Sequence, residues 1–224
     1  MVHPKRTSPV LVLLIVIGVA TASPVYARGS QERQTQERET ASQSTAPTEE
    51  TALPEETEVD DAILAEMREI LSDMGIQTFR SSIEAVDFSL PRLDGGTLSL
   101  SDMNGEFVFL NFWATWCPPC REEMPSMEVL YNELTDMPFR MVAVNVREDA
   151  DTVQSFIDEF GYSYPILLDR DGTLSTNYGV RGIPTSFFIA PDGTVLGMLV
   201  GTRYWDESNI VDGIRRITEI TAEL

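Results

Sequence analysis

The only two cysteines of the 224-residue chain, Cys117 and Cys120, stand three residues apart. Two thiols at this spacing can close a disulfide and open it again, which makes the pair a candidate for thiol-disulfide exchange. A zinc site would need four ligands, but the chain has no further cysteine and its one histidine is His3. A purely structural disulfide would close so short a loop that it would remove little entropy from the unfolded chain. The pattern therefore favours redox chemistry.

The segments on either side of the pair indicate how it is positioned. Residues 106–113 are apolar and aromatic enough for a buried strand, with Trp113 expected in the core, and residues 118–134 follow as a helix. The pair then lies at a helix N-terminus, where unpaired N–H groups and the helix dipole favour an anion. We expect Cys117 to be the low-pKa attacking thiolate and Cys120 to be the buried resolving thiol.

The composition excludes several classes of function. A formal net charge of −20 argues against nucleic acid or an anionic membrane surface as a partner. The only histidine and the only lysine are His3 and Lys5, so the chain after residue 5 has neither. This excludes a histidine general base, a lysine Schiff base and a histidine-ligated metal from the main domain.

The first 27 residues have the three-part order of a secretory signal. Lys5 and Arg6 precede an apolar run at residues 10–20, and a segment of small residues then ends at Ala27. The run is short for a transmembrane helix, so we expect cleavage after Ala27, with retention as a membrane anchor as the alternative. Residues 28–58 hold few large apolar side chains, which predicts a disordered linker.

Residues 59–78 are expected to hold an amphipathic helix. Apolar side chains recur on a helical period, with acids between them and Gly75 as a stop signal. These apolar residues are Ile63, Met67, Ile70, Leu71 and Met74. The helix would either pack on the domain or bind a partner, and the sequence leaves both possibilities open.

Residues 79–224 combine strand-like and helix-like segments. A second apolar strand at 140–146 and a helix at 151–160 follow the first strand and helix, and this succession indicates a parallel sheet with right-handed crossovers. Two turns rich in Gly and Asp predict hairpins, one joining 86–90 to 97–100 and the other joining 184–190 to 194–200. Residues 206–220 supply the last helix. The expected fold class is α/β.

Several motifs of this region resemble the thioredoxin superfamily. Trp-Cys-Pro-Pro-Cys at the end of a central strand, followed later by Gly-Ile-Pro-Thr at 182–185, carries the resemblance. Residues 98–114, 144–148, 168–172 and 187–193 are similar to its extracytoplasmic TlpA/ResA/DsbE-like branch. The resemblance covers residues 79–224 and implies a thioredoxin fold, with a central mixed sheet, helices on both faces and an N-terminal β-hairpin.

The resemblance implies a substrate-binding surface beside the cysteines. The peptide bond before Pro184 should be cis, with this proline against the pair in the place of a metal ligand. The backbone of Ile183 would then form hydrogen bonds with an extended substrate segment. Pro118 and Pro119 belong to the same surface, and Trp116 is expected to form its apolar rim.

One residue departs from the thioredoxin pattern. Thioredoxin itself carries a buried Asp on the central strand, whereas this chain has Asn111, which cannot take a proton. Another acid must therefore serve the buried thiol. The resemblance to the ResA-like branch implies that two glutamates do so, matching Glu123 and Glu148. Glu123 stands at i+3 from Cys120 and shares its helical face, although that spacing also fits a solvated side chain. Two neighbouring aspartates compete with Glu148 as the matching acid.

We expect an exported thiol-disulfide oxidoreductase that reduces protein disulfides with its own dithiol and no other cofactor. The resemblance implies apocytochrome c as the substrate and a membrane thiol carrier as the electron donor. A general exported thiol reductase or isomerase, and a redox-inactive binding module, remain as alternatives. A peroxidase is disfavoured because Thr115 stands two residues before Cys117, where peroxiredoxins have a spacing of three. A DsbA-like oxidase is disfavoured because no long helical insertion precedes the strand at 140.

Overall fold

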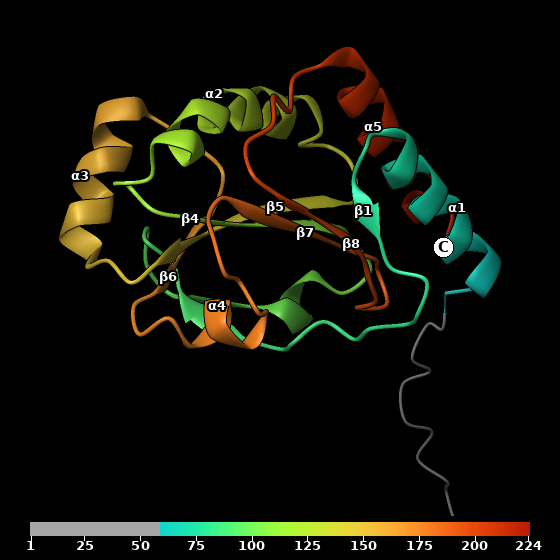
Figure 1. Ribbon diagram of the computed structural model, residues 1–224, viewed down its shortest axis with the longest axis horizontal. Coiled ribbons are helices and arrows are strands. Elements are labelled where there is room, and N and C mark those ends of the chain that lie inside the picture. Colours follow the sequence, from blue (N-terminus) through green and yellow to red (C-terminus); the bar gives the residue numbers. More distant parts are fainter. Residues whose placement is uncertain (1–58) are drawn as a thin grey trace, which may run out of the picture. The chain divides into compact units, whose positions relative to one another are not determined.

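The computed structural model describes residues 59–224, so the predicted signal (1–27) and linker (28–58) lie outside the described residues. The helices are α1 (Asp61–Asp73), α2 (Pro118–Glu133), α3 (Ala150–Phe160), α4 (Thr173–Asn177) and α5 (Ser208–Ala222). The strands are β1 (Gln77–Thr78), β2 (Ser89–Pro91), β3 (Thr97–Ser99), β4 (Phe107–Trp113), β5 (Phe139–Val146), β6 (Ile166–Asp169), β7 (Thr185–Ile189) and β8 (Val195–Val200). Figure 1 shows their arrangement.

Six strands form one mixed sheet in the order β1-β8-β7-β4-β5-β6, and β2 pairs with β3 in a separate hairpin. The strands β4, β5 and β6 are parallel, with α2 and α3 as the crossovers. β7 runs antiparallel to both β4 and β8. The predicted parallel unit and both predicted hairpins are therefore confirmed.

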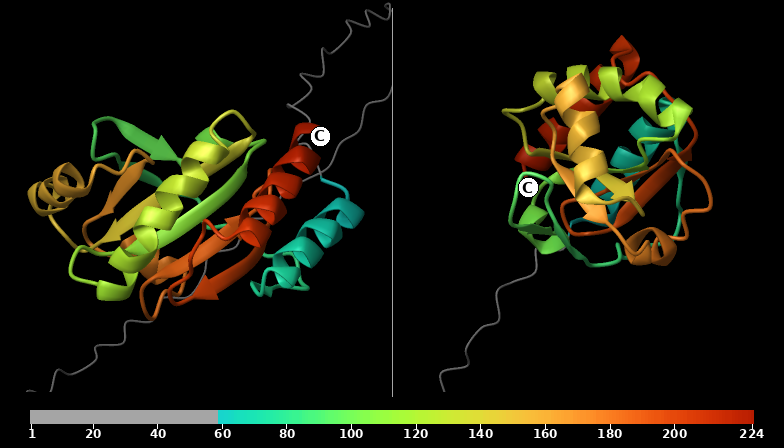
Figure 2. Two further views of the ribbon diagram at one scale, coloured as in Figure 1. Left: turned by 90° about the horizontal axis from the view of Figure 1, so that it is seen from above. Right: turned by 90° about the vertical axis from the view of Figure 1, so that its left-hand side faces the viewer.

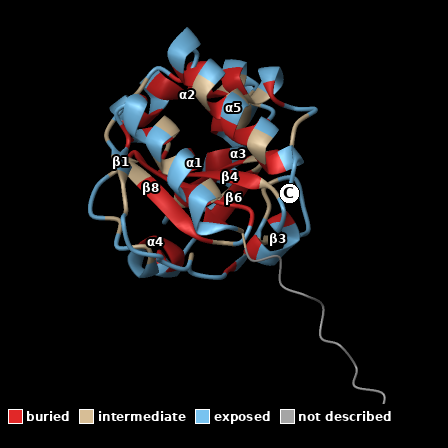
Figure 3. Cartoon of the chain, turned by 90° about the vertical axis from the view of Figure 1, so that its right-hand side faces the viewer, coloured by how far each residue is buried: buried red, intermediate tan, exposed pale blue. Residues whose placement is uncertain are grey.

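The central strand β4 is buried along its whole length, and its side chains alternate between two hydrophobic clusters. Phe109 and Trp113 face the cluster under α1, α2, α3 and α5, whereas Leu110 and Phe112 face the one under α4 and the β2–β3 hairpin. Figure 3 shows the buried residues along the strands and on the inner sides of the helices. Because side chains alternate along a strand, Asn111 points to the α2 side.

The segment 59–78 packs on the sheet domain and is not one helix. α1 ends at Asp73, Gly75 turns the chain with φ +78°, and Gln77–Thr78 forms β1 at the edge of the main sheet. The apolar face of α1 is fully part of the core through Leu64, Met67 and Leu71. Figure 2 shows α1 beside α5. Of the two possibilities that the sequence left open, packing on the domain is the one observed.

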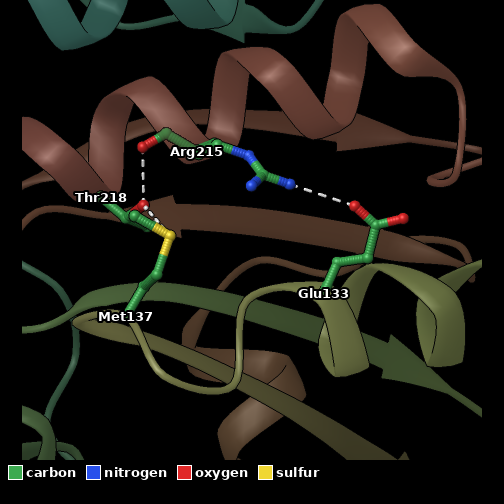
Figure 4. Close-up of polar contacts among 4 residues, drawn as sticks. All are labelled: Glu133, Met137, Arg215 and Thr218. Atoms are coloured by element: carbon green, nitrogen blue, oxygen red, sulfur yellow. Dashed lines mark hydrogen bonds and ion pairs between the residues drawn. The ribbon is translucent and has the colours of Figure 1, made fainter.

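The last helix, α5, is fastened to the end of α2 and the turn that follows. The Arg215 guanidinium lies 3.1 Å from the Glu133 carboxylate, and the Thr218 hydroxyl lies 3.3 Å from the sulfur of Met137 (Figure 4). Exposed ion pairs of this kind contribute little, so burial of the α5 apolar face holds the helix in place. Within residues 59–224, no helix is long and apolar enough to cross a bilayer.

Candidate active site

The two cysteines form a disulfide at the junction between β4 and α2, with their Cα atoms 5.3 Å apart. Cys117 is the N-cap of α2, and its sulfur accepts a hydrogen bond from the backbone N–H of Cys120 (3.3 Å). Pro118 occupies the first helical position, where a missing N–H is no loss. Cys120 is fully buried, whereas Cys117 is 3% exposed.

This geometry distinguishes the two sulfurs once the disulfide is reduced. A thiolate on Cys117 would keep the N–H donor of Cys120 and lie at the positive end of the helix dipole, and both effects lower a thiol pKa. Burial favours the neutral thiol at Cys120. The expected order, with Cys117 as the attacking group and Cys120 as the resolving group, remains a prediction that this geometry supports.

The peptide bond between Ile183 and Pro184 is cis, as the resemblance implied. The carbonyl oxygen of Ile183 lies 3.6 Å from the sulfur of Cys117, so the proline loop faces the cysteine pair. Trp116 is 67% exposed beside it, and Pro118 and Pro119 are exposed as well. Ile183 thus lies beside the sulfur of Cys117, and Trp116, Pro118 and Pro119 are exposed next to the cysteines in the chain.

Glu123 is completely buried, which contradicts the interpretation of this residue as a solvated side chain. Its Oε1 accepts a hydrogen bond from the side-chain amide of Asn111 (2.9 Å). Its Oε2 accepts two, from the backbone N–H of Arg203 (3.1 Å) and from the indole N–H of Trp205 (3.3 Å). Among the described residues, neither cysteine sulfur is a hydrogen-bond partner of this carboxyl group.

Burial raises the pKa of Glu123 from 4.5 to about 7, although the hydrogen bonds from Asn111, Arg203 and Trp205 act in the opposite direction. A carboxyl group with this pKa can both accept and donate a proton near neutral pH. Glu123 stands one helical turn after Cys120. Its predicted exchange of a proton with the buried thiol remains a prediction.

Glu148 takes another position in the site. Its Oε2 accepts hydrogen bonds from the backbone N–H of Thr115 (2.7 Å) and the side-chain amide of Asn145 (2.7 Å), and its Oε1 accepts one from the Thr115 hydroxyl (2.5 Å). The carboxylate therefore holds the loop that leads from β4 to Cys117. The role of Glu148 as an acid that exchanges a proton with the buried thiol of Cys120 remains a prediction.

We expect Glu148→Ala to destabilise the oxidised protein by about 2 kcal/mol, because it leaves the donors of the half-buried Thr115 and the fully buried Asn145 without an acceptor. Glu148→Gln is the matched control, since its amide oxygen can still accept two of these bonds. Urea unfolding at neutral pH measures both variants. Equal stability of the alanine variant and the wild type would mean that the contact does not hold this loop.

The structure also shows contacts that sequence reasoning missed. The partners of Glu123 include Arg203 and Trp205 from the loop after β8, and Asn111 also donates to the Ser186 hydroxyl (3.0 Å). Arg203 acts through its backbone, which leaves no trace in a sequence. Within residues 59–224, no three His, Cys, Asp or Glu residues gather where a metal could bind.

The mixed sheet, the cysteine pair at the start of α2 and the facing cis-proline define a thioredoxin-fold thiol-disulfide oxidoreductase. The chain belongs to the AhpC/TSA family, whose model matches residues 83–198.

Comparisons with named relatives agree with this class. The chain is 41% identical over 122 residues to the thiol-disulfide oxidoreductase ResA of Halalkalibacterium halodurans, covering 54% of this chain and 69% of the relative. It is 38% identical over 128 residues to ResA of Bacillus subtilis, covering 57% and 72%.

Solved structures give the same result. A thiol:disulfide interchange protein of the thioredoxin family from Chlorobium tepidum is 30% identical with a TM-score of 0.54, covering 64% of this chain and 98% of that one. StoA from Bacillus subtilis is 26% identical with a TM-score of 0.51, covering 62% and 99%.

Proposed function

We propose that the protein acts outside the cytoplasmic membrane as a reductant of protein disulfides, with the CxxC of apocytochrome c as its substrate. Its own dithiol is the redox group, and no further cofactor takes part. The observation that carries the proposal is the pairing of a helix-capping Cys117 with a buried Cys120 and a buried carboxyl group one turn further along α2. The identity to ResA proteins supports the choice of chemistry.

The reaction proceeds in two exchange steps. The Cys117 thiolate attacks one sulfur of the substrate disulfide, which forms a mixed disulfide and releases the other substrate sulfur as a thiolate that takes a proton. Cys120 then loses its proton to Glu123 and attacks the sulfur of Cys117, which releases the second substrate sulfur as a thiolate that also takes a proton. The substrate gains two electrons and two protons, and the protein is left with the Cys117–Cys120 disulfide.

The return to the dithiol requires an external thiol donor, and we propose a membrane-bound thiol carrier. The basic, apolar and small-residue order of residues 1–27 supports a place outside the cytoplasm, with the segment either cleaved after Ala27 or kept as an anchor. The acidic surface of the chain suits a basic protein substrate better than an anionic one.

The redox potential of the pair tests the proposed direction. Equilibration with glutathione or dithiothreitol buffers should give a value on the order of −270 mV, the thioredoxin end of the known range, because a reductant must hold its electrons weakly. A value near the roughly −120 mV of DsbA would overturn the reductase proposal. Absence of any redox couple would favour the binding module.

The same preparation tests the substrate and the location. Reduced protein should reduce an oxidised CxxCH peptide faster than a peptide with the same residues in scrambled order. Cell fractionation should place the protein outside the cytoplasm, with Arg28 as its N-terminus if the signal is cleaved. Equal rates for the two peptides would leave a general thiol reductase, and a cytosolic protein with intact Met1 would refute the location.

A further inference from the structure

Residues 201–205, in the loop between β8 and α5, fasten the start of α2 to the rest of the domain. The Thr202 hydroxyl donates a hydrogen bond to the carbonyl oxygen of Pro119, inside the CxxC motif (3.1 Å). Further along the helix, the backbone N–H of Trp205 donates to the hydroxyl of Ser126 (2.9 Å). The loop thus follows the helix surface beside the cysteines.

Between these two tethers, the loop supplies two of the three hydrogen bonds to Glu123. The backbone N–H of Arg203 and the indole N–H of Trp205 both reach Oε2, whereas Oε1 receives only the amide of Asn111. N–H donors of this kind stabilise the ionised carboxylate, because they form strong hydrogen bonds with a charged oxygen. Protonation of that oxygen weakens these bonds. Oε1, with one donor, is therefore the oxygen that takes the proton more readily.

The indole of Trp205 is held rigidly. The residue is fully buried, and its ring centroid lies 4.6 Å from that of Phe109 and 6.0 Å from that of Phe188, so two strands of the sheet fix the ring. With the ring fixed, its N–H points at the carboxylate without further loss of side-chain freedom.

We propose that Trp205 is a positioning residue for the dithiol reaction, which holds Oε2 of Glu123 with its indole N–H and thereby sets the pH at which this buried carboxyl group exchanges its proton. The proposal deepens the proposed function and rests on it, because Glu123 there takes the proton of Cys120. Trp205 itself touches neither the substrate nor the sulfurs in this role. It also lies beyond residues 83–198, the segment matched by the family.

The groups around Glu123 leave its titration easy to recognise. On α2, Arg121 and Glu122 are exposed, and Cys120, one turn before Glu123, does not titrate in the disulfide. In the loop, the Arg203 guanidinium lies 3.9 Å from the Glu207 carboxylate. Before β6, burial raises the pKa of the Tyr164 hydroxyl well above its usual range, so this group stays neutral. No histidine follows His3.

The first test uses the oxidised wild-type protein and its three tryptophan indole N–H signals in an NMR pH series. The Trp205 signal should shift with a midpoint near pH 7, where Glu123 titrates. The Trp113 indole, which is buried but has no hydrogen-bond partner among residues 59–224, should not follow this transition. A Trp205 signal that is unchanged across the titration of Glu123 would overturn the proposal.

The second test is Trp205→Phe, which keeps an aromatic ring and removes the donor. The pKa of Glu123, followed by its carboxyl carbon signal, should rise by about one pH unit because the ionised form loses a hydrogen bond. Trp113→Phe is the matched control, since it replaces an equally buried tryptophan whose N–H has no partner among residues 59–224. This variant should leave the pKa of Glu123 unchanged.

An unchanged Glu123 midpoint in folded Trp205→Phe would also overturn the proposal. If this variant does not fold, the indole titration of the wild type decides alone. Both measurements use the oxidised protein and need no substrate, so they are independent of the proposed function. Failure of the wild-type dithiol to reduce any disulfide would refute that function while the indole and carboxyl signals still report on the contact.

Discussion

Cys117→Ser should lower disulfide reduction to the rate measured without protein, because a serine hydroxyl is not ionised at neutral pH and cannot attack a disulfide. Cys120→Ser should still carry out the first exchange, since its Cys117 keeps the helix N-terminus and the N–H donor of residue 120. It should then stop at the mixed disulfide, with one substrate molecule bound per chain. Mass spectrometry of the adduct, before and after added reductant, measures both outcomes.

The double variant Cys117→Ser/Cys120→Ser is the control for non-specific capture. It should form no adduct, and near-UV circular dichroism should show that all three variants keep their tertiary structure. An adduct on Cys120 in the Cys117→Ser protein, at the rate seen for Cys120→Ser, would reverse the assigned roles. That result would also conflict with the full burial of Cys120.

Long, strongly patterned segments were predictable from the sequence. The apolar run of β4 and the two hairpins are where hydrophobic periodicity and turn residues placed them. β6 and α4 were not predicted. β6 has four buried residues and α4 is one short turn of helix, so neither is long enough to show a recognisable hydrophobic periodicity. β1 was missed for a different reason, since two residues become a strand only by pairing with β8.

The residues of the site also differ in whether the sequence could predict them. The CxxC motif was recognisable because its chemistry lies in residue types and local spacing, and the cis-proline was reached through the resemblance alone. The contact between Asn111 and Glu123 could in part be anticipated, because alternation along β4 turns Asn111 towards α2. The contacts of Arg203 and Trp205 depend on how the chain returns after β8, which no local pattern records.

Glu123→Gln should lower the pKa of Cys120 in the reduced protein and slow the second exchange step. An ionised carboxylate one turn from a thiol disfavours the thiolate by like-charge repulsion, so its removal should lower the thiol pKa by about one unit. The second step should nevertheless slow, because the variant has no group to accept the Cys120 proton. A pH series of thiol alkylation and the rate of mixed-disulfide resolution measure the two effects. Equal curves and equal rates would exclude Glu123 from the proton exchange.

The same variant should change how stability depends on pH in the oxidised protein, where no thiol titrates. Burial raises the pKa of Glu123 from 4.5 to about 7, so between these values the folded state keeps a proton that the unfolded chain has lost. Stability therefore falls as pH rises through this range, and the full loss, about 3 kcal/mol, is reached above pH 7. The glutamine side chain of the variant carries no such proton. The free energy of unfolding of the variant, relative to that of the wild type, should therefore rise by about 3 kcal/mol between pH 4 and pH 8.

Urea unfolding of both proteins at a series of pH values isolates this effect, since all other acids are common to the two chains. The introduced glutamine can keep the donors of Arg203 and Trp205 on its amide oxygen, and its amide group can face Asn111, whose own Oδ1 has no partner among residues 59–224. The variant should therefore fold at every pH in the series. A stability difference that stays constant from pH 4 to pH 8 would mean that Glu123 titrates at the same pH in the folded and unfolded states. It could then not be the group that exchanges a proton with Cys120 near neutral pH.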